Sequence, residues 1–141
     1  MAPNRRRPVV GSLMVAVGVV HVGITPLLFP GSVQSIVEGG VVNSIEADPD
    51  LAQLRGIAFW YATTGLALIV SGWSVGVVER RAEPTPTALP LCLAGVGLWG
   101  VVLMPKSPFW VFVALAALAA ARAAHERRAD KAGPQRRRPV R

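Results

Sequence analysis

The stretch IAFWYATTGLALIVSGWSVGVV, residues 57–78, contains no Asp, Glu, Lys or Arg. At a rise of 1.5 Å per residue, a helix of this length measures about 33 Å, enough to cross a hydrocarbon core of about 30 Å. Trp60 and Tyr61 lie near one end, where their partly polar rings suit the membrane interface, and Glu79 follows the other end. The stretch therefore predicts a transmembrane helix, around which the rest of the chain has to be arranged.

Three further apolar runs predict a protein that crosses the membrane four times. They cover residues 9–29, 88–104 and 108–121, and the last two are near the shortest length that spans a bilayer. Because only a short turn separates these two, they must be antiparallel neighbours. With residues 57–78 as the second span, the chain predicts an all-α fold: a four-helix transmembrane bundle in one membrane domain, residues 9–124.

The basic residues indicate the topology. The chain of 141 residues is 52% hydrophobic and has a formal net charge of +7. Of its 15 Lys and Arg residues, all except Arg55 and Lys106 would lie on one side of a four-span bundle, which is the positive-inside pattern. We therefore expect both termini in the cytoplasm, with residues 1–8 as a basic N-terminus and residues 125–141 as a basic, disordered tail. The basic runs have no aromatic stacking platform and no recognition motif, so we expect no nucleic-acid partner.

The hydrophilic segment 31–56 joins the first two spans and would lie outside. Apolar residues recur in it with helical spacing, and Ser32 is placed as an N-cap. Gly39 and Gly40 interrupt this pattern, so we expect two short pieces. The pattern predicts an outer amphipathic segment between helices 1 and 2. It is expected to lie on the mouth of the bundle or in the headgroup layer, with a lid over a binding site as the alternative.

The helix of the second span is expected to begin in water near Pro49, because Asp48 can cap a helix and Pro is tolerated at the first helical position. Arg55 would then lie about one turn outside the hydrocarbon, close to the acidic outer segment. An ion pair there would be exposed and would contribute little stability. The carboxylates between residues 38 and 50 do not follow the spacing of a calcium loop, so we expect a solvated acidic face and no metal site.

His21 is the one ionisable side chain expected well inside a span, about 12 Å from the outer end of the first helix. Such groups usually face the interior of a bundle. Three roles stay open: a neutral histidine that links helices by hydrogen bonds, a polar group that lines a small-ligand pocket, and a group that transfers protons. At the same depth, the second span offers hydroxyl groups and the third offers glycines. The candidate pocket residues are His21, Thr25, Thr63, Thr64, Gly95 and Gly97.

Small residues are placed for close helix contacts. Gly72 and Gly76 form a G-x-x-x-G motif, and the third span contains Gly95, Gly97 and Gly100. Such residues let helix backbones approach in lipid. We expect these contacts within one molecule, with a homodimer face as the alternative.

Motifs that would indicate catalysis are missing from the sequence. There is no H-E-x-x-H, no G-x-S-x-G and no glycine loop of the phosphate-binding kind. A haem held by two histidines would need a second histidine on a facing helix, whereas His125 lies at the opposite end of the bundle. We therefore expect no catalytic residue, no cofactor and no enzymatic activity.

Short motifs add a family resemblance over residues 9–121. They are His21 in the first span, Val41-Val42-Asn43 before Asp48-Pro49, Ala58-Phe59-Trp60 in the second helix, and the VLMPKSPFW turn of residues 102–110. On these motifs the chain resembles an uncharacterised family of small bacterial integral membrane proteins, similar in layout to four-helix proteins of the DoxX type. The resemblance implies a four-span bundle in the bacterial inner membrane and brings no established activity with it.

Three functional hypotheses follow. The leading one is a multi-pass protein of the bacterial plasma (inner) membrane without enzymatic activity, an accessory or scaffold protein that meets the lipid bilayer and a membrane protein partner or a second copy of itself. The alternative is the binding or passage of a small apolar ligand, a quinone or a lipid, in an outer-half pocket near His21. A membrane enzyme is the weakest of the hypotheses, because no catalytic residues are found.

Overall fold

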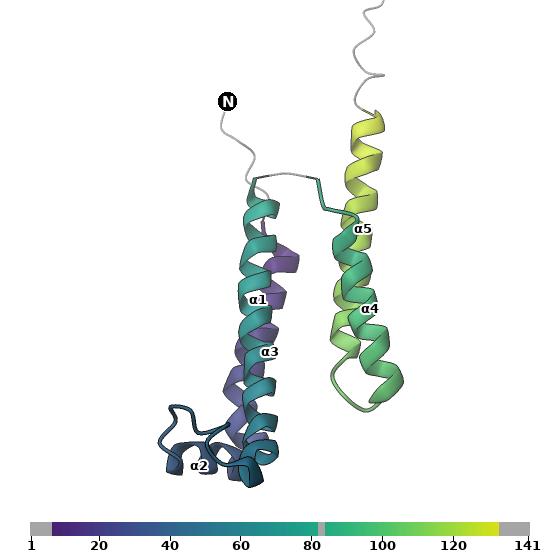
Figure 1. Ribbon diagram of the computed structural model, residues 1–141. Coiled ribbons are helices and arrows are strands. Elements are labelled where there is room, and N and C mark those ends of the chain that lie inside the picture. The colour runs from purple at the N-terminus through teal and green to yellow at the C-terminus, as the bar shows by residue number, and fades with distance from the viewer. Residues whose placement is uncertain (1–6, 82–83, 133–141) are drawn as a thin grey trace, which may run out of the picture. The chain divides into compact units, whose positions relative to one another are not determined.

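The structure, a computed structural model, describes residues 7–81 and 84–132, with side chains up to residue 129. Its helices are α1 (Val9–Leu28), α2 (Pro30–Glu38), α3 (Pro49–Arg80), α4 (Ala88–Leu103) and α5 (Trp110–Ala132), and the described residues contain no strand (Figure 1). The all-α fold class is confirmed. The chain divides into two compact units, here called the α1–α3 unit (Gly11–Val75) and the α4–α5 unit (Gly76 onward together with the start of α1). The assembly of four helices into one bundle stays a prediction.

Helices α1 and α3 approach each other through glycines. A Cβ added to Gly18 would lie 2.6 Å from the carbonyl oxygen of Gly65, and one added to Gly72 would lie 2.8 Å from the carbonyl oxygen of Gly11. The order of these contacts makes the two helices antiparallel, and they lie side by side (Figure 1). The backbones are thus so close at these points that only glycine fits without a shift of the helices.

The same register continues with small residues toward α2. Thr25 follows Gly18 by seven residues on α1, and Ala58 precedes Gly65 by seven residues on α3. Thr25 is 5% exposed and Ala58 is 2% exposed. Small residues at every seventh position keep the same side of each helix facing its partner. Gly72 packs on Gly11 of α1, so the prediction that it makes a helix contact within one molecule is confirmed.

Helices α1 and α3 are long and apolar enough to cross a membrane. Only 28% of the apolar window of α1 and 22% of that of α3 is buried, whereas the core helix of a soluble protein is mostly buried. Exposed apolar faces of this extent need an apolar environment, which hydrocarbon or another helix supplies. Helix α4 is apolar as well but shorter, with 16 residues.

The predicted start of α3 at Pro49 is confirmed. Asp48 accepts a hydrogen bond from the backbone N–H of Asp50 through Oδ1 (3.0 Å), the bond of an N-cap residue. The start of α2 differs from the expectation that Ser32 is its N-cap. Helix α2 begins at Pro30, and Ser32 is 4% exposed inside the helix. Proline starts a helix readily because its φ is already helical and its missing N–H would have no helical partner.

Helices α4 and α5 are antiparallel neighbours, as the short turn predicts. A Cβ added to Gly97 would lie 2.9 Å from the backbone nitrogen of Val113, and one added to Gly100 would overlap the ring of Phe109. The turn is closed by the indole of Trp110, which donates to the carbonyl oxygen of Pro105 (3.1 Å). Gly97 and Gly100 therefore serve the packing of this hairpin.

The bounds of α5 correct two predictions. The helix begins at Trp110 instead of Pro108, which lies in the turn. It also continues to Ala132, so the prediction of disorder from His125 is wrong for residues 125–132, while residues 133–141 lie outside the described part of the chain. Alanine, glutamate and arginine favour a helix here. Glu126 further ties α5 to the link before α4, because its Oε2 accepts from the backbone N–H of Thr85 (2.9 Å).

A carboxylate near the end of α3 binds groups from distant parts of the sequence, all within the α4–α5 unit. Glu79 Oε1 accepts a hydrogen bond from the backbone N–H of Val10 (3.2 Å) and forms an ion pair with Arg122. Arg122 also donates to the carbonyl oxygen of Arg7 (3.3 Å). Val10 lies in the first turn of α1, where a negative charge is favourable because the backbone N–H groups point outward.

We predict that Gly18→Ala weakens the contact between α1 and α3, because the added methyl group would overlap backbone atoms. Overpacking of this kind costs about 1–3 kcal/mol. Gly23→Ala is the matched control on the same helix, since no described atom outside the local helix backbone lies within 4 Å of its added Cβ. Unfolding in detergent, followed by circular dichroism, should give a lower midpoint for Gly18→Ala than for Gly23→Ala. Equal midpoints would contradict a role of the close glycine contact.

Candidate functional site

A groove of about 640 Å³ lies where α2 and the loop after it meet α3. Such a volume is typical of sites that bind small molecules. The lining is mainly apolar and comes from α1, α2, the loop and α3: Thr25, Val33, Ile36, Val41, Asn43, Ser44, Ile45, Glu46, Ala58, Phe59, Trp60 and Ala62. All of these residues belong to the α1–α3 unit.

The end of α2 directs the chain over this groove. Gly40 has a φ of 83° and donates its N–H to the carbonyl oxygen of Val37 (3.0 Å), and Val41 donates to the carbonyl oxygen of Ile36 (3.0 Å). These two bonds define a Schellman motif, which commonly ends with an apolar contact between the residues at the positions of Ile36 and Val41. Both side chains line the groove. The expectation of a second helical piece after Gly40 is wrong, because residues 41–47 form turns.

Val41 has an unusual backbone conformation. Its φ is 65°, a value that branched side chains rarely adopt because the Cβ substituents crowd the backbone. The carbonyl oxygen of Val41 accepts a hydrogen bond from the Ser44 hydroxyl (2.9 Å), which holds the turn closed. Strained backbone of this kind is often found at functional sites, and here it places an apolar side chain in the groove wall.

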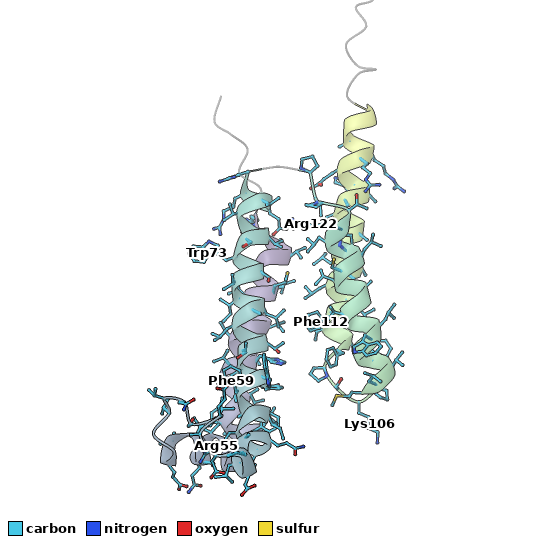
Figure 2. All side chains as sticks on the ribbon, viewed as in Figure 1. Arg55, Phe59, Trp73, Lys106, Phe112 and Arg122 are labelled. Atoms are coloured by element: carbon cyan, nitrogen blue, oxygen red, sulfur yellow. The ribbon has the colours of Figure 1, made fainter. Side chains whose placement is uncertain are left out.

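Arg55 on α3 holds this turn in place by hydrogen bonds. Its Nε donates to the hydroxyl of Ser35 on α2 (2.9 Å), and Nη1 donates to the carbonyl oxygen of Ser44. Arg55 is 6% exposed and Ser44 is 1% exposed, and Figure 2 shows Arg55 at the end of α3 that lies beside α2. The guanidinium thus joins three segments that surround the groove.

The sequence-based expectation for Arg55 is therefore wrong. We expected that any ion pair of Arg55 with the acidic segment would be exposed, whereas Arg55 is buried and bonds neutral oxygens of Ser35 and Ser44. The reason is the Schellman turn, which folds residues 41–44 back onto α3 and brings a carbonyl oxygen to the guanidinium. A buried charge is costly unless hydrogen bonds satisfy it, so these two bonds are needed for the turn to lie where it does.

His21 lies in an aromatic cluster instead of a hydroxyl layer. Its ring stacks on Tyr61 with 4.0 Å between the ring centroids and an angle of 11° between the planes, and Phe29 meets Tyr61 edge-on at 5.1 Å. Tyr61, which the sequence analysis assigned to the membrane interface, is thus the side chain that the structure places against His21. Aromatic contacts of this kind fix the orientation of the rings.

The other predicted pocket residues have contacts within their own helix or within their own unit. Thr25 Oγ1 donates to the carbonyl oxygen of His21 (2.9 Å) and Thr64 Oγ1 to that of Trp60 (2.9 Å), so each hydroxyl bonds its own helix. Thr63 is half-buried, and of the predicted set only Thr25 lines the groove. Gly95 and Gly97 belong to the α4–α5 unit, where Gly97 packs on α5 and Gly95 is exposed.

We predict that Arg55→Lys loosens the segment that covers the groove. Lysine keeps the charge but not the fork of donors that reaches Ser35 and Ser44. Loss of such bonds costs about 1–3 kcal/mol, so amide exchange in residues 36–47 should accelerate by roughly 5- to 150-fold.

Arg80→Lys is the control for this experiment, because Arg80 is exposed and bonds the carbonyl oxygen of Gly76 in its own helix (3.3 Å). Hydrogen exchange measured by mass spectrometry should leave residues 36–47 unchanged in that variant. Equal protection in Arg55→Lys and the wild type would contradict the fastening role.

No curated protein and no solved structure matches the chain. A family model with the description "Family of unknown function (DUF6463)" matches residues 5–126, which include all residues of the groove and of the His21 cluster. The prediction of an uncharacterised family is confirmed: the chain belongs to DUF6463, a family of unknown function.

Proposed function

We propose that the protein is a four-span membrane protein that binds a small apolar molecule, a quinone or a lipid, in the groove beside α2. The observation that carries this proposal is the groove of about 640 Å³ with its mainly apolar lining. In this respect the proposal favours the ligand-binding hypothesis over a pure scaffold, and it moves the site from His21 to the segment between α1 and α3.

The composition of the lining supports binding without catalysis. Phe59 and Trp60 offer aromatic faces, while Asn43 and Glu46 offer polar groups. Glu46 alone is ionisable among the described residues that line the groove, and general acid–base chemistry commonly uses more than one positioned group. The proposed protein therefore holds its ligand and does not convert it.

The location of the proposed site is the outer side of the bacterial inner membrane. The exposed apolar faces of α1 and α3 and the apolar helix α4 support three of the spans. The fourth span of the proposal is the apolar first half of α5, up to residue 121. The basic residues, concentrated away from Arg55 and Lys106, support cytoplasmic termini. This four-span layout is the one that the resemblance to DoxX-type proteins implies.

A second candidate is the accessory or scaffold protein. The observation that favours it is Gly95, which is exposed and whose added Cβ would meet no described atom within 4 Å outside the local helix backbone. Exposed apolar side chains surround it on α4, among them Leu91, Leu98 and Trp99. A helix of a partner or of a second copy would find room for a close approach there.

We predict that Ala62→Phe prevents the ligand from binding in the groove. Ala62 lines the groove, so a phenyl ring in its place would occupy the space of the ligand. Native mass spectrometry of the protein purified in mild detergent should show a bound small molecule in the wild type and about a tenfold lower bound fraction in Ala62→Phe. Ala67→Phe is the matched control, because Ala67 is exposed on the same helix and does not line the groove.

The same measurement separates the competing hypotheses. His21→Leu should retain the ligand, since His21 does not line the groove. Loss of the ligand in His21→Leu but not in Ala62→Phe would place the site in the His21 layer and contradict the proposal. A protein partner retained in all variants, with no small molecule in any of them, would favour the scaffold.

We also predict the topology that the proposal requires. In a background of Cys92→Ala, which removes the one cysteine, Lys106→Cys should react with a membrane-impermeant thiol reagent added to intact cells. Arg128→Cys should react only after the cells are permeabilised. Labelling of Arg128→Cys in intact cells would contradict cytoplasmic location of the C-terminal part.

A further inference from the structure

A second groove, of about 530 Å³, lies between α4 and α5. Its walls are apolar, with Leu91, Ala94 and Leu98 from α4 and Ala117, Ala120 and Ala124 from α5. All of its lining residues belong to the α4–α5 unit. It has no lining residue in common with the groove of the proposed function, which belongs to the other unit.

One end of this second groove is polar. Thr87 and Arg127 line it there, and Arg127 Nη2 donates to the Thr87 hydroxyl (3.0 Å). A bond with a neutral hydroxyl does not neutralise the guanidinium charge, and arginine has five donors in a fork that suits phosphate. Arg128, next in sequence, is exposed and does not line the groove. The carboxylate of Glu126 is engaged with the backbone N–H of Thr85.

The length of the groove agrees with one leaflet of a bilayer. At 1.5 Å per residue, the path along α4 from Thr87 to Leu98 measures about 16 Å. Half of a hydrocarbon core of about 30 Å is about 15 Å. An acyl chain that lies along the groove would therefore reach from the polar end to about the middle of the membrane.

We propose that the groove between α4 and α5 binds one anionic phospholipid of the cytoplasmic leaflet, with an acyl chain along the apolar walls and the headgroup phosphate on Arg127 and Thr87. This inference rests on the membrane location in the proposed function. The charge complementarity decides the occupant: an apolar helix of a partner would fill the walls but bring no anion to Arg127. Basic pockets at the cytoplasmic ends of transmembrane helices bind anionic headgroups in this way.

The test compares phosphatidylglycerol with phosphatidylcholine of the same acyl chains, added to the full chain in mild detergent and counted by native mass spectrometry. The wild type should retain phosphatidylglycerol in preference to phosphatidylcholine. Arg127→Gln should weaken retention of phosphatidylglycerol by about fivefold. Arg128→Gln is the matched control, because it removes the same charge from a residue that does not line the groove.

A second pair of variants tests the apolar walls. Ala117→Phe should reduce the retention of both lipids, whereas Ala114→Phe, on an exposed position of α5 outside the groove, should not. Circular dichroism establishes that each variant is folded, and if Ala117→Phe does not fold, the two arginine variants decide. Ala62→Phe, which fills the other groove, should leave phosphatidylglycerol bound.

Equal retention of the two lipids by the wild type would overturn the proposal, and so would equal losses in Arg127→Gln and Arg128→Gln, which would indicate diffuse attraction by the basic surface. Failure of the membrane location itself is recognised separately, since the protein would then not sediment with membranes after carbonate extraction. Retention of phosphatidylglycerol that depends on both Arg127 and Ala117 supports the proposal.

Discussion

The close approach of α1 and α3 at Gly18 and Gly65 is the constraint on which the α1–α3 unit depends. It leaves less space than a methyl group needs between the two backbones, and in hydrocarbon such contacts supply packing where hydrophobic burial between helices supplies little. The seam also fixes the distance that the segment from α2 to α3 must cover, because α2 starts immediately after α1. The segment that covers the groove, α2 and the loop up to residue 48, is therefore held at both ends, because it connects two helices that are packed against each other.

In this unit, the single side chain of Arg55 holds together the segments around the groove. Its bonds to Ser35 and Ser44 join α2, the loop and α3, while the apolar wall of the groove supplies little cohesion across an open space. A guanidinium is suited to this task because it keeps its charge when buried and presents donors in several fixed directions. The groove therefore depends on the buried guanidinium of Arg55, which holds α2 and the loop that cover the groove.

Much of the fold follows from the sequence, because long apolar runs and helix signals are local. The start of α3 at Pro49 and the antiparallel pair α4 and α5 were predictable from Asp48-Pro49 and from the short turn at 105–107. The site was harder to predict. Counting residues along separate helices gives depth but not rotation, so Thr63 and Thr64 were grouped with His21 although Tyr61 is its neighbour.

The groove itself depends on backbone geometry that the sequence indicates only weakly. In the sequence, Gly39-Gly40 indicates only a break in a helical pattern. The structure adds a Schellman motif, in which Gly40 is left-handed and the apolar Val41 folds back onto α2. The burial of Arg55 follows from that fold-back. From the sequence alone, a charged residue one turn outside a span is expected to face water. The local sequence pattern does not show that a distant loop will fold back and cover it.

The carboxylate of Glu79 has a consequence for biosynthesis. It bonds the N–H of Val10 and the guanidinium of Arg122, residues that leave the ribosome at very different times, since the chain is made from its N-terminus. Until Arg122 in α5 has been synthesised, Glu79 cannot form this ion pair. During that interval the pairing of α1 with α3 relies on the glycine seam, the stack of His21 on Tyr61 and the bond between Val10 and Glu79. The ion pair with Arg122 therefore forms late in the synthesis of the membrane domain.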